Sequence, residues 1–262
     1  MNTDGLKVIH PAAKIAADVS IESFVTIGAN VEIGEGTWIG PNVTIMDGVK
    51  IGKQCRIFPG AVVGAIPQDL KFDGESSKIE IGDNVTIREY CTLNRGTKAN
   101  NTTVIEDDCL LMAYVHVAHD CVLKKGVVLA NNVNLAGHIE IGEYAILGGL
   151  TAVHQFVKIG AYSMVGGGSL VRKDVPPFIK AAREPLAYVG INSVGLGRHQ
   201  FSKERIHYIQ DMYRLLFVKG LNVTQAMEAI LKELPSTKEQ ALLFDFINSS
   251  KRGLIRGFRQ RK

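Results

Sequence analysis

The chain places a branched aliphatic residue at every sixth position over most of its length. From Ile9 to Val171 this register has 28 positions, and 25 of them are Ile, Leu or Val. The exceptions are Asp69, Glu75 and Ala99. A fixed short period constrains the fold more than any single segment does, because each repeat can bury its apolar side only by stacking on its neighbours. The sequence therefore predicts a solenoid.

The spacing within each hexad indicates which solenoid. Apolar or small residues occupy the register position and the position two residues before it, so alternate side chains of a short strand point inward. Three such strands close one coil of a parallel β-helix, and the 28 hexads amount to about nine coils. Hexads of this kind resemble those of left-handed hexapeptide-repeat proteins. The handedness rests on that resemblance, because left-handed crossovers oppose the usual preference.

The predicted fold is thus mainly β, a left-handed parallel β-helix followed by a small α-helical domain. We assign residues 1–196 to the β-helix and residues 197–262 to the helical domain. Polar segments interrupt the hexads near residues 64–80 and 97–103, but the register returns unchanged, which indicates loops that leave a corner of the coil. In the helical domain, Ser202, Thr224 and Ser236 are the expected N-cap residues.

Composition fits a protein of the cytoplasm. The first residues do not resemble a signal peptide, and no run approaches the roughly 20 apolar residues of a membrane span. We therefore expect a cytoplasmic location and no stable membrane insertion. The four cysteines each lie two residues before a register position, so we expect reduced thiols that act as small core residues. They are Cys55, Cys91, Cys109 and Cys121.

Positive charge is concentrated at the end of the chain. The net charge is +4, yet residues 197–262 hold 13 Lys and Arg against 6 Asp and Glu. A basic end attracts nucleic acid, anionic lipid or an acidic protein. Aromatic residues are not interleaved with these cations, so we do not expect nucleic acid as a partner. The basic residues among the last twelve are Lys251, Arg252, Arg256, Arg259, Arg261 and Lys262.

Four histidines fall within 39 residues, and none occupies an inward position: His116, His119, His138 and His154. Residues 18 apart stack in this fold, so His119, Gly137 and Gln155 should share one edge. A neutral imidazole is a suitable general base for a hydroxyl group. Asp69, in the first loop, is the candidate carboxylate that orients it. Because the sequence has no nucleophile elbow, direct transfer is favoured over a covalent enzyme intermediate.

A metal site is the alternative interpretation of the histidines. His116 and His119 are three residues apart, and a neighbouring subunit could supply a third ligand, as in zinc-dependent carbonic anhydrases of this fold. Those proteins have a further histidine five residues later, and nothing follows His154 at that offset. We therefore expect neither a metal nor a bound cofactor.

Several longer strings are far more specific than the hexads. The segments IPQDLKF (66–72), HVAHDC (116–121), LAGH (135–138), GGLTAVHQF (148–156) and GINSVGLGRHQFS (190–202) resemble the UDP-N-acetylglucosamine O-acyltransferase family. The resemblance extends to RGLIR at 252–256. It implies transfer of a (3R)-hydroxyacyl chain from acyl carrier protein to the 3-hydroxyl of UDP-N-acetylglucosamine, the first step of lipid A synthesis. It also implies a homotrimer, and an acidic carrier protein that docks on basic surface.

Residue roles follow from the same resemblance. It makes His119 the general base, Asp69 its partner, and the backbone N–H of Gly137 the donor to the oxyanion. Met164 and Gly167 would close the acyl pocket, where a glycine leaves room for a long chain. Val194 and His199 depart from the family pattern, in which an acidic residue and an arginine are common. The expected substrate-binding residues are Gln68, Lys71, His116, His138, His154, Gln155, Asn192 and Arg198.

Three rival functions stay open from the sequence. One is another hexapeptide acyltransferase, with an amino-sugar acceptor or an acyl-coenzyme A donor. A second is a zinc-dependent hydratase, and a third is a scaffold without catalysis. The cluster of histidines outside the core argues against the scaffold.

Overall fold

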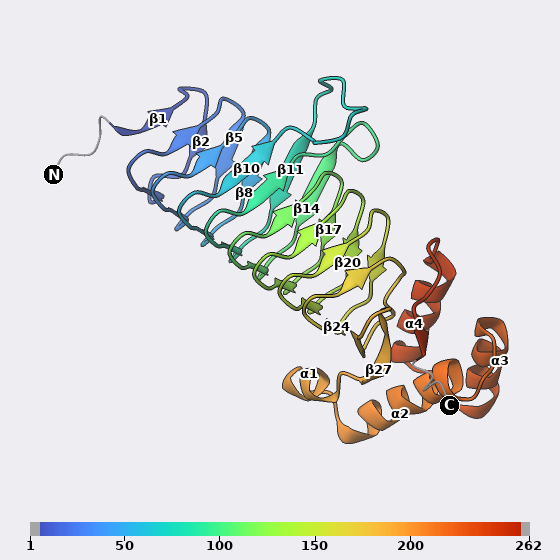
Figure 1. The fold of residues 1–262 in the computed structure, drawn as a ribbon. Coiled ribbons are helices and arrows are strands. Elements are labelled where there is room, and N and C mark those ends of the chain that lie inside the picture. Colours follow the sequence, from blue (N-terminus) through green and yellow to red (C-terminus); the bar gives the residue numbers. More distant parts are fainter. Residues whose placement is uncertain (1–5, 258–262) are drawn as a thin grey trace.

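The computed structural model describes residues 6–257, which form a long three-sided prism with helices at one end (Figure 1). We name its three parallel sheets A, B and C. Sheet A consists of β1 (Val8–Ile9), β4 (Thr26–Ile27), β7 (Thr44–Ile45), β10 (Val62–Ala65), β13 (Thr92–Asn94), β16 (His116–Val117), β19 (Asn134–Leu135), β22 (Ala152–Val153) and β25 (Leu170–Val171). Its nine strands match the expected number of coils.

The other two faces are built in the same way. Sheet B consists of β2 (Lys14–Ile15), β5 (Val31–Ile33), β8 (Val49–Ile51), β11 (Lys78–Ile81), β14 (Thr102–Ile105), β17 (Val122–Leu123), β20 (Glu140–Ile141) and β23 (Lys158–Ile159). The prism strands of sheet C are β3 (Ser20–Ile21), β6 (Trp38–Ile39), β9 (Arg56–Ile57), β12 (Thr86–Ile87), β15 (Leu110–Leu111), β18 (Val128–Leu129), β21 (Ile146–Leu147) and β24 (Met164–Val165).

The chain visits the sheets in the order A, B, C, so each coil has an AB, a BC and a CA corner. Strands of one sheet pair in parallel with residues 18 apart wherever no loop intervenes, as in His116 with Asn134. The aliphatic register residues point inward: Ile27, Leu93 and Leu129, for example, are almost completely buried. The fold predicted from the hexads, a left-handed parallel β-helix with a helical end, is confirmed.

The cysteines take part in this core as expected. All four are free and buried, and each lies within the same cluster as the aliphatic residues. Burial raises the pKa of Cys91, Cys109 and Cys121 to about 12, so these thiols stay protonated and unreactive at neutral pH.

Both interruptions of the repeat leave the prism at the AB corner, in consecutive coils. Loop 1, residues 66–77, joins β10 to β11, and loop 2, residues 95–101, joins β13 to β14. Strand β11 pairs with β8 before it and β14 after it, so the stacking continues past both loops. The loops project from the prism in the blue-green part of Figure 1. The next coil along the AB corner carries His119.

The prism ends in a hairpin on which the helices pack. Strand β26 (Ile179–Ala182) extends sheet C, β27 (Ala187–Ile191) pairs with it in antiparallel orientation, and β28 (Arg256–Gly257) returns to pair with β27. The helices are α1 (Ser193–Arg198), α2 (Lys203–Tyr213), its π-helical continuation η2 (Arg214–Val218), α3 (Val223–Glu233) and α4 (Lys238–Ser249). None of the helices in residues 6–257 is long and apolar enough to cross a bilayer.

The helix caps confirm one expectation and correct two. Ser202 caps α2 by accepting a hydrogen bond from the Arg205 backbone. Helix α3 begins after Asn222 rather than Thr224, because Asn222 and Gln225 form a reciprocal capping box. Helix α4 is capped by Thr237 rather than by Ser236.

Candidate active site

The AB corner stacks the residues that the 18-residue period predicts. His119, Gly137 and Gln155 occupy equivalent positions of three successive coils, and the backbone links them through His138 N–H to His119 O at 3.0 Å and Phe156 N–H to Gly137 O at 3.1 Å. Contact between the first two is direct: a Cβ atom on Gly137 would lie only 2.5 Å from His119 Cε1. A glycine is therefore required for the His119 ring to lie where it does.

A cavity of about 580 Å³ opens between this edge and the two loops. The three residues that break the aliphatic register, Asp69, Glu75 and Ala99, all line it. The breaks in the repeat are thus gathered at one place in the molecule. The other lining residues are Gln68, Leu70, Lys71, Phe72, Thr97, Lys98, His119, His138, Gln155 and Phe156.

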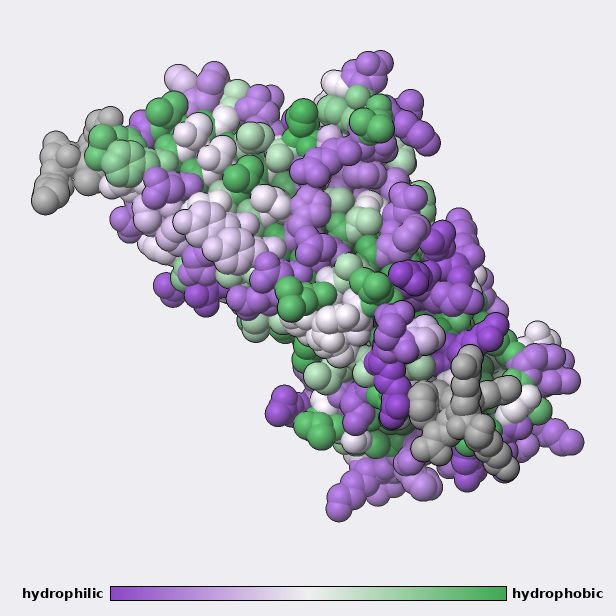
Figure 2. All heavy atoms as spheres, viewed as in Figure 1, coloured by the Kyte–Doolittle hydropathy of each residue, from purple (hydrophilic) through white to green (hydrophobic). Residues whose placement is uncertain are grey.

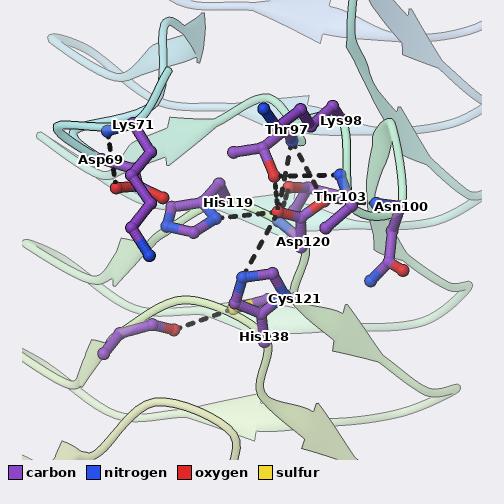
Figure 3. A network of polar contacts seen from close by, with 12 residues as sticks. Asp69, Lys71, Thr97, Lys98, Asn100, Thr103, His119, Asp120, Cys121 and His138 are labelled. Carbon is purple, nitrogen blue, oxygen red and sulfur yellow. Dashed lines mark hydrogen bonds and ion pairs between the residues drawn. The ribbon is translucent and has the colours of Figure 1, made fainter.

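His119 is held by a carboxylate that the sequence analysis did not single out. Its Nδ1 atom lies 2.8 Å from Asp120 Oδ2, and the two side chains are 12% and 0% exposed (Figure 3). Because an ionised carboxylate only accepts hydrogen bonds, Nδ1 carries the proton, and Nε2 is left as an acceptor. The position of Asp120 directly after His119 was the one signal for it in the sequence. Its other hydrogen-bond partners come from loop 2, and the hexad register does not predict where that loop lies.

Asp120 collects several hydrogen bonds besides that of His119. Its carboxylate accepts from Thr97 N at 3.1 and 3.2 Å, from Thr97 Oγ1 at 2.7 Å and from Asn100 N at 3.3 Å. Burial raises the pKa of Asp120, but the bonds from Thr97 and His119 and the nearby His138 outweigh it, so the net shift is downward. The carboxylate is therefore ionised at neutral pH and fixes both His119 and loop 2.

Asp69, the partner expected from the sequence, lies in loop 1. Its carboxylate accepts a hydrogen bond from Lys71 N at 3.0 Å. In Figure 3 it lies on the side of the His119 ring away from Asp120, and both residues line the cavity. The His119 ring is therefore placed between two carboxylates, with the hydrogen bond in this structure made to Asp120.

His138 lies beside His119 and is packed on an aromatic ring. Its ring stacks on Phe156 with centroids 4.5 Å apart, and its edge meets His119 at 4.9 Å. Burial lowers the pKa of His138, against the opposing charges of Asp120 and Asp69. The imidazole is thus held in a neutral form that can donate or accept a hydrogen bond in the cavity.

Gly137 combines a steric role with a free donor. The residue is buried, its carbonyl accepts from Phe156, and its own N–H has no partner in the part of the chain that the structure describes. The Gly137 backbone packs against the His119 ring, as the short distance from a Cβ at this position shows. Its N–H is therefore a donor close to where an oxyanion formed next to the base would need one.

The other predicted site residues lie outside this cavity. His116 projects from sheet A and pairs with Thr92 Oγ1 at 2.8 Å; burial lowers its pKa. Met164 lies on the outer side of sheet C, and Gly167 at the CA corner. Asn192 is buried, donates to Tyr162 O at 2.9 Å and caps α1, so its side chain serves the fold. Arg198, at the end of α1, is exposed.

His154 makes a contact that no pattern in the sequence indicates. Arg252, from the segment after α4, lies with Nη2 2.7 Å from His154 Nδ1. The same Nδ1 lies 3.2 Å from the Gln155 carbonyl oxygen, a contact that would require it to donate. Because arginine only donates, the shorter contact with Arg252 assigns Nδ1 as an acceptor and places the proton on Nε2. The segment is anchored by buried Asp174, whose carboxylate accepts from Ser250 and whose backbone bonds Gly253 and Ile255. The basic end of the chain thus reaches the AB edge.

His119, Asp120 and His138 are also of the residue types that bind metals, and their ligand atoms lie within 4.8 Å of one another. The donor set fits a metal poorly. Asp120 already accepts hydrogen bonds from Thr97, Asn100 and His119, and Nδ1 of His119 is protonated towards it. A metal ion would have to displace these bonds.

Comparison with known proteins decides the family. The second-domain model of UDP-N-acetylglucosamine O-acyltransferase matches residues 174–255, and the bacterial transferase hexapeptide model matches residues 30–65 and 102–137. An acyl-[acyl-carrier-protein]–UDP-N-acetylglucosamine O-acyltransferase from Thiobacillus denitrificans is 45% identical over 250 residues, which cover 95% of this chain and 97% of that protein. The chain belongs to the UDP-N-acetylglucosamine O-acyltransferase family.

Solved structures of the family superimpose on nearly the whole chain. A UDP-N-acetylglucosamine acyltransferase from Bacteroides fragilis superimposes with a TM-score of 0.95 at 47% identity, covering 98% of this chain and 100% of that one. The enzyme from Acinetobacter baumannii gives a TM-score of 0.93 at 43% identity, with coverage of 96% and 98%. The resemblance inferred from short motifs is thereby confirmed, and the chain is an acyltransferase.

Proposed function

We propose that this protein transfers a (3R)-3-hydroxyacyl chain from acyl carrier protein to the 3-hydroxyl of UDP-N-acetylglucosamine, the reaction that begins lipid A synthesis. Family membership supports the substrates. The observation that carries the mechanism is the geometry at His119: Nδ1 is bound to a buried carboxylate, and the ring lines a cavity and packs against Gly137, whose N–H has no partner among the described residues.

The chemistry follows from these groups. His119 Nε2 accepts the proton of the sugar hydroxyl while the oxygen attacks the thioester carbon. The Gly137 N–H donates to the oxyanion. As the intermediate collapses, the carbon–sulfur bond breaks and the departing sulfur takes the proton from the His119 imidazolium. The cavity lining contains no Ser or Cys, and the hydroxyl of Thr97 is bonded to Asp120, which favours direct transfer.

The two carboxylates have different parts in this proposal. Asp120 orients His119 and stabilises its positive form without taking the proton, as the acid of a catalytic triad does. Asp69, on the cavity side, adds a negative charge close to the imidazolium. Gln68, Lys71, His138 and Gln155 line the cavity or its edge and are proposed to bind the substrates.

A homotrimer would complete the site. His119 is at the AB corner, whereas α1 with Arg198 packs at the BC corner through Asn192 and Tyr162, and Gly167 is at the CA corner. One chain cannot bring these corners together, but neighbouring prisms can. The outer side of sheet A favours such packing because it is uncharged, with Val8, Thr26, Thr44, Val62, Thr92, His116, Asn134, Ala152 and Leu170. Mixing inactive His119→Ala and Arg198→Ala chains should restore activity if the site is shared.

The basic helical end is proposed to dock acyl carrier protein in the cytoplasm. The described segment after α4 contributes Lys251, Arg252 and Arg256, next to exposed Arg172 and Lys173 at the last AB corner. Figure 2 shows hydrophilic side chains along this end of the molecule. Attraction of this kind raises the association rate and is weakened by salt. Arg259, Arg261 and Lys262, which belong to the same expectation, lie outside the described residues.

The deciding assay offers purified protein a mixture of hydroxyacyl carrier proteins and UDP-N-acetylglucosamine, with product identified by mass spectrometry. Parallel reactions replace the donor with acyl-coenzyme A and the acceptor with the 3-amino sugar nucleotide. Turnover with carrier protein and the hydroxyl sugar supports the proposal; preference for either substitute overturns it. Near-stoichiometric zinc that is essential for activity would instead favour a hydratase.

A further inference from the structure

The two loops that form the cavity are joined to one another by a single side chain, Glu75. Its Oε1 atom accepts a hydrogen bond from the backbone N–H of Lys98 in loop 2 at 2.9 Å. Its Oε2 atom accepts from the N–H of Asp73, within loop 1, also at 2.9 Å. One carboxylate thus closes the end of loop 1 and ties it to loop 2.

Other hydrogen bonds attach the start of loop 1 to the prism and attach loop 2 to Asp120. At the start of loop 1, the Asn94 side chain donates to Ile66 O at 2.8 Å. Loop 2 is fixed by Thr97 and Asn100, which donate to Asp120, the residue bonded to His119 (Figure 3). A continuous path therefore runs from Asp69 along loop 1 to Glu75, across to loop 2, and through Asp120 to His119.

Local bonds within loop 1 give Asp69 a definite position relative to Glu75. The Asp69 carboxylate accepts from Lys71 N, and its carbonyl accepts from Phe72 N at 3.0 Å, which forms a tight turn next to Asp73. The tip itself makes little contact with the prism, since Leu70 is fully exposed. The place of Asp69 is thus set by the two attached ends of the loop, and Glu75 holds the end nearer to loop 2.

We propose that Glu75 is a positioning residue that holds Asp69 opposite His119 by joining loop 1 to loop 2. The hydrogen bonds from Lys98 and Asp73 lower the pKa of Glu75, so the carboxylate is ionised and keeps both acceptors at neutral pH. The inference rests on the proposed function, because it assigns Glu75 an effect on acyl transfer through Asp69.

Glutamate is the side chain that suits this task. A glutamine has one carbonyl oxygen and one NH₂ group, so Glu75→Gln keeps one of the two bonds and turns a donor toward the other N–H. Glu75→Ala loses both. Displacement of a reacting group by about 1 Å costs up to roughly 100-fold in rate. We therefore expect kcat/KM to fall about 10-fold or more in Glu75→Ala and by less in Glu75→Gln.

The first arm of the test does not depend on activity. Amide hydrogen exchange should become faster at Lys98 and Asp73 in Glu75→Ala, two positions that are distant in sequence. The matched control is Glu80→Ala, which removes a surface carboxylate of β11 that pairs with Lys78 outside this cavity. Unchanged exchange at Lys98 in Glu75→Ala would overturn the proposal. Glu75→Gln gives the same comparison should the alanine variant unfold.

The second arm asks whether Glu75 acts through Asp69. In a double-mutant cycle, adding Glu75→Ala to Asp69→Ala should change kcat/KM less than about 2-fold if the two effects share one path. The pH dependence of kcat/KM should change in the same direction in Glu75→Ala as in Asp69→Ala, because both variants take the Asp69 carboxylate away from the His119 ring. Fully multiplicative effects, or pH profiles that change in opposite directions in the two single variants, would refute the assignment. Absence of acyl transfer in the wild type would reject the proposed function, while the exchange arm still decides whether Glu75 joins the loops.

Discussion

The AB and BC corners are built from the same hexads but do different things with their carboxylates. At the BC corner, Asp83 accepts from Lys53 N at 2.7 Å, and Asp107 accepts from Asp83 N at 2.8 Å. Both carboxylates are exposed. Each accepts a hydrogen bond from a backbone N–H in the corresponding turn of the preceding coil. At the AB corner, Asp120 is 1% exposed and bonds two loop residues and a histidine.

The difference comes from the loops and not from the coil. Loop 2 covers the AB corner and supplies additional N–H and O–H donors, so Asp120 stays ionised although it is buried, and it still has an acceptor site for His119. Asp107 is exposed, so its spare lone pairs are open to solvent. A corner of the same regular scaffold thus becomes a site where an insertion excludes water and adds donors.

Removal of the base should give the largest effect. His119→Ala eliminates the proton acceptor, and general base catalysis contributes about 10²–10⁴-fold, so we expect kcat to fall by at least that much. The fold should stay intact, because Asp120 keeps its hydrogen bonds from Thr97 and Asn100, with a loss of about 1–3 kcal/mol in the free energy of unfolding. The control is His207→Ala, at an exposed histidine of α2. Substantial turnover by His119→Ala would mean that another group takes the proton.

Exchange of one carboxylate at each corner tests the comparison directly. Asp120→Asn places an NH₂ group among donors, so we expect kcat/KM to drop about 100-fold and the free energy of unfolding to fall by about 1–3 kcal/mol. Asp107→Asn, at an exposed position, should change stability by no more than about 0.5 kcal/mol and leave activity intact. Equal losses at both corners would show that burial by loop 2 does not matter.

The loss of stability in Asp120→Asn should depend on pH. The folded-state pKa of Asp120 is lowered from the ordinary value of 3.8, so its contribution to stability is fully present above that value. It is lost as pH falls through the lower, folded-state pKa. The stability difference between wild type and Asp120→Asn should therefore shrink below pH 3.8, measured by denaturant unfolding at several pH values. A difference that grows on acidification would contradict the shift.

Gly137 should be the next most sensitive position. A methyl group there would lie 2.5 Å from the His119 ring, so Gly137→Ala must displace the base, and we expect a loss of about 10-fold or more in kcat/KM. Gly197→Ala is the control, since a Cβ at Gly197 meets nothing within 4 Å. If Gly137→Ala retained full activity, the contact between Gly137 and His119 would have no bearing on catalysis.

The sequence predicted the periodic part of this molecule well and the loop contacts poorly. The hexad register predicted the prism, the stacking of His119 over Gly137, and that each loop leaves from a corner of the coil, but not that both loops leave from the same corner. The register could not predict that Asp120 orients His119. That role depends on hydrogen bonds from Thr97 and Asn100, and the positions of these two residues are set by the path of loop 2. The periodicity also could not predict the contact of Arg252 with His154, because Arg252 belongs to the segment after the last helix, outside the repeats.

Arg252 should give the smallest effect. Its hydrogen bond to His154 lies at the surface and is worth about 0.5–1.5 kcal/mol, which corresponds to roughly 3–10-fold. Because the bond favours the form of His154 that is protonated on Nε2 over the form that would donate from Nδ1 to Gln155 O, Arg252→Gln should raise a substrate KM by that factor with little change in kcat. Lys251→Gln removes the same charge from the neighbouring exposed position, so it should raise KM by a smaller factor, and that increase should disappear at high salt. Equal increases in both variants, abolished by salt, would show that Arg252 contributes only to the general positive field, as the rest of the basic end does.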